Sequence, residues 1–125
     1  MKIINWFQIP ATDMDRAVKF YTAVLGASFH RMEHGGSKHA FFAMGTLESE
    51  RTGGEIVQSA MFGKPGQDGT TIYLSAPGSL KTVLERVEPA GGRIVMPHMG
   101  IGENGFITLV LDTEGNRIGL HSMTA

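Results

Sequence analysis

Hydrophobic and polar positions recur in the same order in the two halves of this chain. Each half begins with a short apolar strand, at residues 3–10 and 70–76, followed by a helix with apolar residues every three or four positions. In both halves the helix ends at glycine and three further strands follow. The two helix starts lie about 65 residues apart. This self-similarity predicts two βαβββ modules.

In the first half, the side-chain oxygens of Thr12–Asp15 are suited to cap the start of the helix, and Gly26 is suited to end it. The apolar stripe between them consists of Met14, Ala17, Val18, Tyr21 and Leu25. Residues 33–37 predict a hairpin turn between two strands. Residues 45–54 predict a polar loop, and residues 55–61 the last strand of this half.

In the second half, Ser79 is the expected cap of the helix, and Gly91-Gly92 the expected end. The strands expected after it cover residues 93–96, 106–111 and 117–123, with a glycine-rich loop over residues 97–105. The prediction is therefore one α+β domain over residues 1–125, in which module one covers 1–62, the linker 63–69 and module two 70–125. We expect the modules to form curved mixed sheets around a cleft.

Composition narrows the classes of function. The chain of 125 residues has a net charge of −1 and no basic run, which argues against nucleic acid and membrane surfaces as partners. The absence of cysteine excludes disulfides, thiolate metal sites and a cysteine nucleophile. No apolar run approaches the length of a membrane span and no signal-peptide pattern is present, so we expect a cytoplasmic protein.

Two segments carry a resemblance to a known family. IPATDMDRAVKFYTAVLG and LDTEGNRIGLH resemble the first strand-to-helix signature and the closing strand of the glyoxalase/bleomycin-resistance/extradiol-dioxygenase superfamily. The branch that looks most similar is that of predicted enzymes related to lactoylglutathione lyase. The superfamily includes lyases, epimerases, thiol transferases, dioxygenases and metal-free drug-binding proteins, so the resemblance implies the fold but no single activity. It also implies a homodimer.

The resemblance also implies which positions would hold a metal ion. Enzymes of the superfamily hold one divalent ion with His, Gln or Glu on the first and last strands of each module. The equivalent positions in this chain are occupied by Trp6, Ile56, Thr71 and Gly119. These residue types do not assemble a divalent site. The expectation is therefore a degenerate site with no metal and no other cofactor.

Polar groups lie two residues further along the same strands, and side-chain alternation keeps them on the same face. They are Gln8, Gln58, Tyr73 and His121. The repeat pairs Gln8 with Tyr73 and Gln58 with His121. In one interpretation these groups orient a small polar ligand, with His121 as the candidate catalytic acid or base. In the other they cap sheet backbone or lie at the surface.

Four further residues are candidates for ligand binding. Trp6 offers an apolar wall and one N–H donor, and His98 is expected to approach from the loop over residues 97–105. Phe42 and Phe106 are weaker candidates because the sequence does not fix their strand faces. By contrast His30, His34 and His39 are interpreted as surface residues.

A shifted metal site made from Gln8, His121 and either Glu55 or His98 is an alternative. It is disfavoured because Glu55 lies three residues before Gln58 in a strand, so the two face opposite ways.

The sequence thus favours a small-molecule pocket without metal, in a binding protein or a lyase- or isomerase-like enzyme. Two alternatives remain: a metal-dependent glyoxalase-type lyase or dioxygenase, and a protein-interaction module that keeps only the fold.

Overall fold

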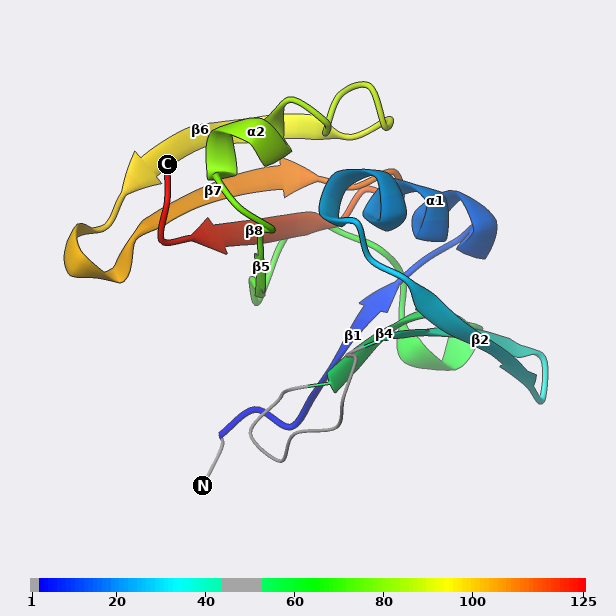
Figure 1. Ribbon diagram of the computed structural model, residues 1–125. Coiled ribbons are helices and arrows are strands. Elements are labelled where there is room, and N and C mark those ends of the chain that lie inside the picture. Colours follow the sequence, from blue (N-terminus) through cyan, green and yellow to red (C-terminus); the bar gives the residue numbers. More distant parts are fainter. Residues whose placement is uncertain (1–2, 44–52) are drawn as a thin grey trace.

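The computed structural model describes residues 3–43 and 53–125. They form two four-stranded sheets with the same internal order (Figure 1). The first sheet contains, from edge to edge, β1 (Trp6–Pro10), β4 (Gly53–Gln58), β3 (Ser37–Phe42) and β2 (Phe29–His34). The second contains β5 (Tyr73–Ser75), β8 (Arg117–Ser122), β7 (Phe106–Leu111) and β6 (Arg93–Gly100).

The pattern of parallel and antiparallel strand pairs is also the same in the two sheets. In each sheet the first strand pairs parallel with the last strand, and the remaining pairs are antiparallel. The prediction of an α+β protein with two βαβββ modules is therefore confirmed. Of the predicted loop at 45–54, residues 45–52 lie outside the described residues, and β4 begins at Gly53.

Helix α1 (Met14–Leu25) begins and ends where the sequence predicts. The Asp13 side chain accepts a hydrogen bond from the Arg16 amide at 3.1 Å, which caps the first turn. Gly26 ends the helix in the left-handed region, with φ of 67°, a conformation that costs glycine little. The buried stripe of the helix consists of Met14, Ala17, Phe20, Tyr21 and Val24.

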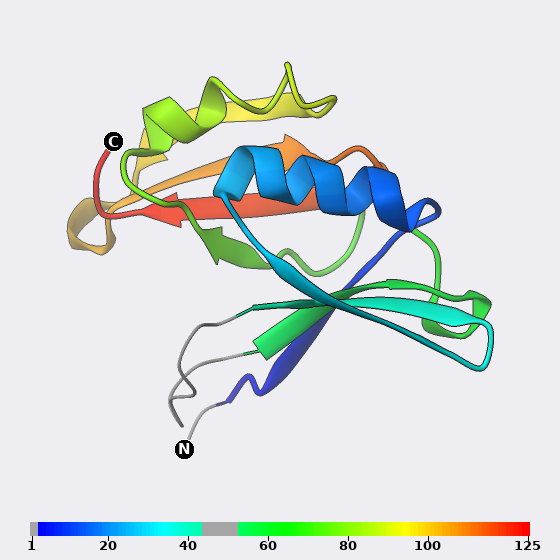
Figure 2. The ribbon, with the colours of Figure 1, turned by 45° about the vertical axis from the view of Figure 1, so that its right-hand side comes forward.

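Helix α1 packs against one face of the first sheet and also reaches the second module. It contacts β3 and β4, and it lies beside α2 (Leu80–Leu84), as Figure 2 shows. The Phe20 ring fits over Gly92, where an added Cβ would lie 2.5 Å from a ring carbon. One continuous core therefore includes α1, α2 and the strands beneath both helices.

The carboxylate of Glu114, in the turn between β7 and β8, lies at the start of α1. Its Oε1 accepts from the amides of Thr12 and Asp13, both at 2.8 Å, and its Oε2 accepts from Arg16 Nε at 2.6 Å. The Glu114 side chain has no exposed area. Burial alone would raise the pKa of Glu114, but the hydrogen bonds from Arg16, Asp13 and Thr12 outweigh it and lower the pKa to about 2. An internal carboxylate thus takes the anion position of the helix N-terminus.

A second polar link between the modules is buried. The Tyr21 hydroxyl donates to Asp112 Oδ2 at 2.6 Å. Asn116 Nδ2 donates to the same oxygen at 3.0 Å and to the Pro10 carbonyl at 2.8 Å. Burial, followed by the charge of Asp112, raises the pKa of Tyr21 well above its ordinary value, so the phenol keeps its proton. The network fixes the first strand and helix to the last hairpin.

The second module departs from prediction in two places. Helix α2 ends at Leu84, although the apolar stripe continues to Val87, because the chain then forms turns up to Gly91. Strand β6 is longer than predicted and extends through Pro97 and His98 to Gly100, so the loop expected at 97–105 is wrong for residues 97–100 and the connection covers only residues 101–105. Pro97 is accommodated because β6 is an edge strand with two register irregularities. Two short 3₁₀ turns, Ala60–Phe62 and Gly102–Asn104, complete the described elements.

Within the two described ranges, neither helix has the length and apolar character needed to cross a membrane.

Candidate functional site

The first sheet has one face that α1 leaves uncovered. Strand β1 pairs with β4 in the register that places Gln8 beside Glu55. Ile9 and Ile56 are buried in the core on the α1 side, so side-chain alternation turns Trp6, Gln8 and Glu55 to the other side. We call this side the open face; on β3 it carries His39 and Phe41, which follow the same alternation and contact these residues.

Glu55 lies at the centre of the open face and has three side-chain hydrogen-bond partners. Its Oε2 accepts from Trp6 Nε1 at 3.0 Å and from Gln8 Nε2 at 3.2 Å, and its Oε1 lies 2.5 Å from His39 Nδ1. Glu55 is 5% exposed. Burial alone would raise the pKa of Glu55, but the hydrogen bonds from His39, Trp6 and Gln8 outweigh it and lower the pKa. The structure therefore places a charged carboxylate inside a converging set of donors.

Aromatic rings surround this carboxylate. The Phe41 ring stacks on His39, with centroids 5.9 Å apart and planes 7° apart, and lies 5.9 Å from the Trp6 ring. Phe62 presents its ring to His39 at 6.3 Å and 73°. Trp6 is 48% and Phe62 41% exposed. The site is thus polar at its centre and apolar and accessible at its margin.

Backbone hydrogen bonds just after β1 and β5 show how the two modules correspond. Ala11 N donates to Val57 O, and Ala76 N donates to His121 O. Val57, and not Gln58, is therefore the counterpart of His121. The predicted pairing of Gln58 with His121 is wrong by one residue, and a shift of one residue along a strand reverses the face.

The same correspondence relates Glu55 to Gly119. Gln8 lies beside Glu55 in the first sheet, and Tyr73 lies beside Gly119 in the second. The predicted pairing of Gln8 with Tyr73 is confirmed. The assignment of Ile56 to the ligand position of the family is wrong: Ile56 has no exposed area and lies in the core, and Glu55 is the residue at that position.

The residues at the family's metal positions do not fit a divalent ion. Trp6 and Thr71 offer no imidazole or carboxylate, and both oxygens of Glu55 are already engaged. At Gly119 an added Cβ would lie 2.3 Å from a carbon of the Tyr73 ring, so this ring covers the place of the fourth side chain. No group of three His, Cys, Asp or Glu suited to a metal occurs within residues 3–43 and 53–125.

Gln58 lies apart from the open face. Its Oε1 accepts a hydrogen bond from the Met14 amide at 2.8 Å, at the start of α1. The expectation that Gln8 and Gln58 share one face is therefore wrong. The expectation that Glu55 and Gln58 face opposite ways is confirmed, because Glu55 bonds with residues of the open face.

Tyr73 and His121 lie on the second sheet. His121 Nε2 lies 2.6 Å from the carbonyl oxygen of Asn104. Since a carbonyl only accepts, Nε2 carries the proton, and Nδ1 is the acceptor of a neutral ring. Tyr73 is 46% exposed beside Gly119, on the same face as His121.

The predicted residues do not form one wall within a single chain. Tyr73 lines a cavity of about 910 Å³ between the modules, together with Phe7 and Phe42. Trp6 and Gln8 instead line a groove of about 500 Å³ beside β1. The two hollows adjoin, since Phe7 and Ile72 line both, but neither is lined by Gln58 or His121.

His98 and Phe106 lie on β6 and β7, the two strands at the edge of the second sheet opposite β5. His98 belongs to edge strand β6, and its ring meets the edge of Phe106 at 6.4 Å and 67°. The expectation that His98 reaches the cleft from a loop is wrong, because the sheet continues through it. Phe42 packs against Phe7 and Phe29 on the α1 side, with centroids 5.5 and 4.7 Å away.

Sequence reasoning missed the contribution of His39 and Phe41. The turn at Gly35-Gly36 sets the register of the β2–β3 hairpin and thereby puts His39 and Phe41 on one face. That signal was present in the sequence. The sequence does not specify the pairing of β3 with β4, and this pairing places His39 next to Glu55.

Comparison with curated proteins finds relatives in mycobacteria. The chain is 30% identical over 120 residues to proteins named "Putative glyoxylase CFP32" in Mycobacterium bovis and Mycobacterium tuberculosis. The match covers 93% of this chain and 44% of each relative, so the chain spans less than half the length of these proteins.

Solved structures show the same fold at lower identity. Glyoxalase I of Leishmania major is similar, with a TM-score of 0.72 and 21% identity, over 98% of this chain and 88% of that one. The fosfomycin resistance protein FosX of Listeria monocytogenes is similar with a TM-score of 0.67 and 14% identity, over 100% of this chain and 94% of that one. A family model matches residues 3–120. The chain belongs to the glyoxalase/bleomycin resistance protein/dioxygenase superfamily.

Proposed function

We propose that this chain binds a small organic molecule at the open face of the first sheet and does so without a divalent metal ion. The observation that carries the proposal is the convergence of Trp6, Gln8 and His39 on the buried carboxylate of Glu55. Four polar groups held together beside exposed aromatic rings are typical of a pocket in which a few fixed polar atoms orient an apolar ligand.

The absence of a metal in this proposal follows from the donor chemistry. A divalent ion needs several imidazole or carboxylate ligands with free lone pairs. Glu55 is the one carboxylate or imidazole at the four family positions, and its oxygens already form hydrogen bonds with Trp6, Gln8 and His39. The named relatives, which are putative glyoxylases, suggest lyase- or isomerase-like chemistry, whereas a metal-free site equally suits a binding protein of the bleomycin-resistance kind.

We further propose that a second copy of the chain completes the pocket. Strands β1 and β5 are each the edge strand of a sheet, hydrogen-bonded along one side within the described sheets. An edge strand offers its free backbone groups to another chain. Trp6 on β1 and Tyr73 on β5 are both about half exposed, so pairing of these edges between copies would place further side chains of the second copy beside the open face.

A ligand screen tests the proposal. A metabolite library is screened for thermal stabilisation of untagged protein, since a ligand that binds the native state raises apparent stability. We expect at least one ligand whose effect is lost in Trp6→Ala and kept in Val95→Ala, which removes a similarly exposed apolar side chain from β6.

Metal analysis of the same untagged sample separates the alternatives. Stoichiometric zinc, nickel or iron, with loss of stabilisation after chelation, would contradict the metal-free proposal and favour a metal-dependent enzyme. A ligand whose binding is unchanged in Trp6→Ala would contradict the location of the site.

A further inference from the structure

We propose that His39, positioned by Glu55, is the hydrogen-bond acceptor for the bound molecule, and that this molecule is a neutral, planar compound bearing a hydroxyl group. The inference rests on the proposed function, because it names the recognition chemistry of the same open face. His39 belongs to β3, a strand that carries none of the positions from which the family implies metal ligands.

The hydrogen bond between His39 and Glu55 determines which ring nitrogen faces a ligand. The ionised carboxylate of Glu55 only accepts, so the proton between the two groups belongs to Nδ1 of His39. In the neutral ring Nε2 then carries the lone pair. A carboxylate that fixes the tautomer and the ring orientation in this way leaves the opposite nitrogen ready to accept a proton or a hydrogen bond.

The position of the His39 ring leaves Nε2 within reach of a ligand. The His39 side chain is 14% exposed, and no described residue forms a hydrogen bond with Nε2. Among the described residues, one buried side-chain nitrogen or oxygen has no hydrogen-bond partner, and it is Nε of Arg117. Nε2 of His39 also has no partner in this part of the chain but is not among the buried atoms, so it keeps contact with solvent. Stacking on Phe41 and the contact with Phe62 hold the ring in place.

The surroundings of His39 select the shape and charge of the ligand. The rings of Trp6, Phe41 and Phe62 provide apolar surfaces against which a planar molecule packs. Glu55 is charged, and within the described chain no Lys or Arg forms an ion pair with it. An anionic ligand would therefore meet a like charge, whereas a neutral hydroxyl donates to Nε2 without that repulsion.

The test compares naphthol with its methyl ether, methoxynaphthalene, by calorimetric titration near neutral pH. The two probes share the planar ring system, and only naphthol donates a hydrogen bond. One good hydrogen bond makes binding about fivefold to tenfold tighter, so we expect the wild-type protein to prefer naphthol by that factor. We expect His39→Phe, which keeps an aromatic ring and removes the nitrogens, to bind both probes equally.

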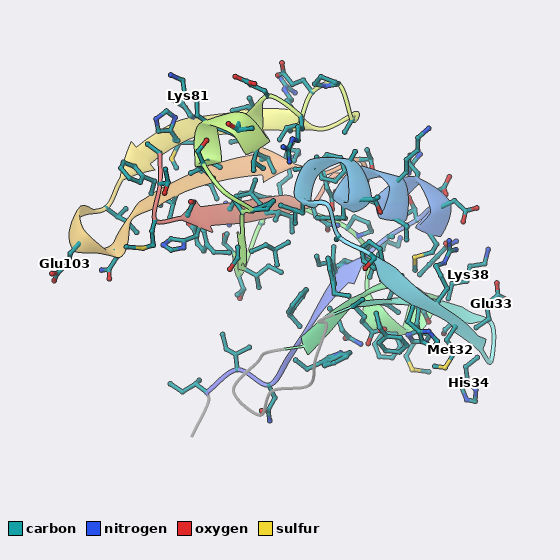
Figure 3. The ribbon with its side chains drawn as sticks, viewed as in Figure 1. Met32, Glu33, His34, Lys38, Lys81 and Glu103 are labelled. Carbon is teal, nitrogen blue, oxygen red and sulfur yellow. The ribbon has the colours of Figure 1, made fainter. Side chains whose placement is uncertain are left out.

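Glu55→Gln tests the positioning role of Glu55. With the amide oxygen of the new side chain accepting from Trp6 and Gln8, its NH2 group faces Nδ1 of His39 and donates to it. The proton of the neutral ring then belongs to Nε2, which no longer accepts, and the preference for naphthol falls. His34→Phe is the matched control, since His34 lies at the tip of the same hairpin (Figure 3) and is exposed. It should keep the wild-type preference. Thermal unfolding of each variant verifies folding independently of the probes.

The outcomes are distinct. Equal affinity of the wild-type protein for both probes, binding of neither, or a preference that survives in folded His39→Phe overturns the inference. The proposed function stands separately if a ligand from the metabolite screen still depends on Trp6.

Discussion

Replacing Glu114 by glutamine isolates the charge that connects the β7–β8 turn to the start of α1. The substitution keeps the shape of the side chain and removes its charge. The wild-type pKa of about 2, against an ordinary value of 4.5, corresponds to at most about 3 kcal/mol of stability. Arg16 is half exposed, so solvent screening reduces its share of this figure. We expect Glu114→Gln to lower the free energy of unfolding by about 1–2 kcal/mol at neutral pH.

The pH dependence of that loss is the more specific test. Because the folded-state pKa is depressed, the contribution of Glu114 is complete above about pH 4.5 and disappears as the pH falls towards about 2. Urea unfolding at a series of pH values should therefore show wild type and variant converging in acid. Glu103→Gln, at the exposed 3₁₀ turn of the second sheet (Figure 3), should match wild type throughout. A difference between wild type and Glu114→Gln that stays constant with pH would refute the charge argument.

Three further substitutions test packing and backbone, each measured by urea unfolding. Gly119→Ala should destabilise the protein by about 2 kcal/mol or more, because its Cβ meets the Tyr73 ring at 2.3 Å; an unchanged free energy would mean that this ring moves freely. Gly26→Ala should cost only about 1 kcal/mol, since its positive φ is strained but its surroundings are open. Tyr21→Phe should cost about 1–3 kcal/mol by removing the buried hydroxyl that donates to Asp112 Oδ2, where Asn116 then remains as donor, and a loss below about 0.5 kcal/mol would contradict that role.

Much of the fold was accessible from the sequence because local signals and the repeat agreed. Asp13 and Gly26 bound the first helix by elementary capping chemistry, and Ser79 caps the second in the same way. The predictions failed where tertiary context decides. The end of α2 was placed too late, since an apolar stripe persists through turns that pack like a helix. Pro97 and His98 were assigned to a loop, although an edge strand with irregular register admits both.

The candidate site was harder to predict from the sequence, because it depends on the register between strands that are distant along the chain. Alternation correctly separated Glu55 from Gln58, yet the alignment of the first module was displaced by one residue, which exchanged Ile56 for Glu55. Such a displacement leaves the hydrophobic pattern almost intact and reverses every side chain. His39 gained its role only through its neighbour on β4, a contact between residues 16 positions apart that no local pattern specifies.

The link between Glu114 and the start of α1 has a consequence for the order of synthesis. Thr12 and Glu114 are 102 residues apart, and Tyr21 and Asp112 are 91 residues apart. A ribosome makes the first helix long before it makes the groups that satisfy the helix's amides and its buried phenol. We therefore expect the first module to reach its full stability only after the β7–β8 hairpin has been made, and the two modules to fold cooperatively.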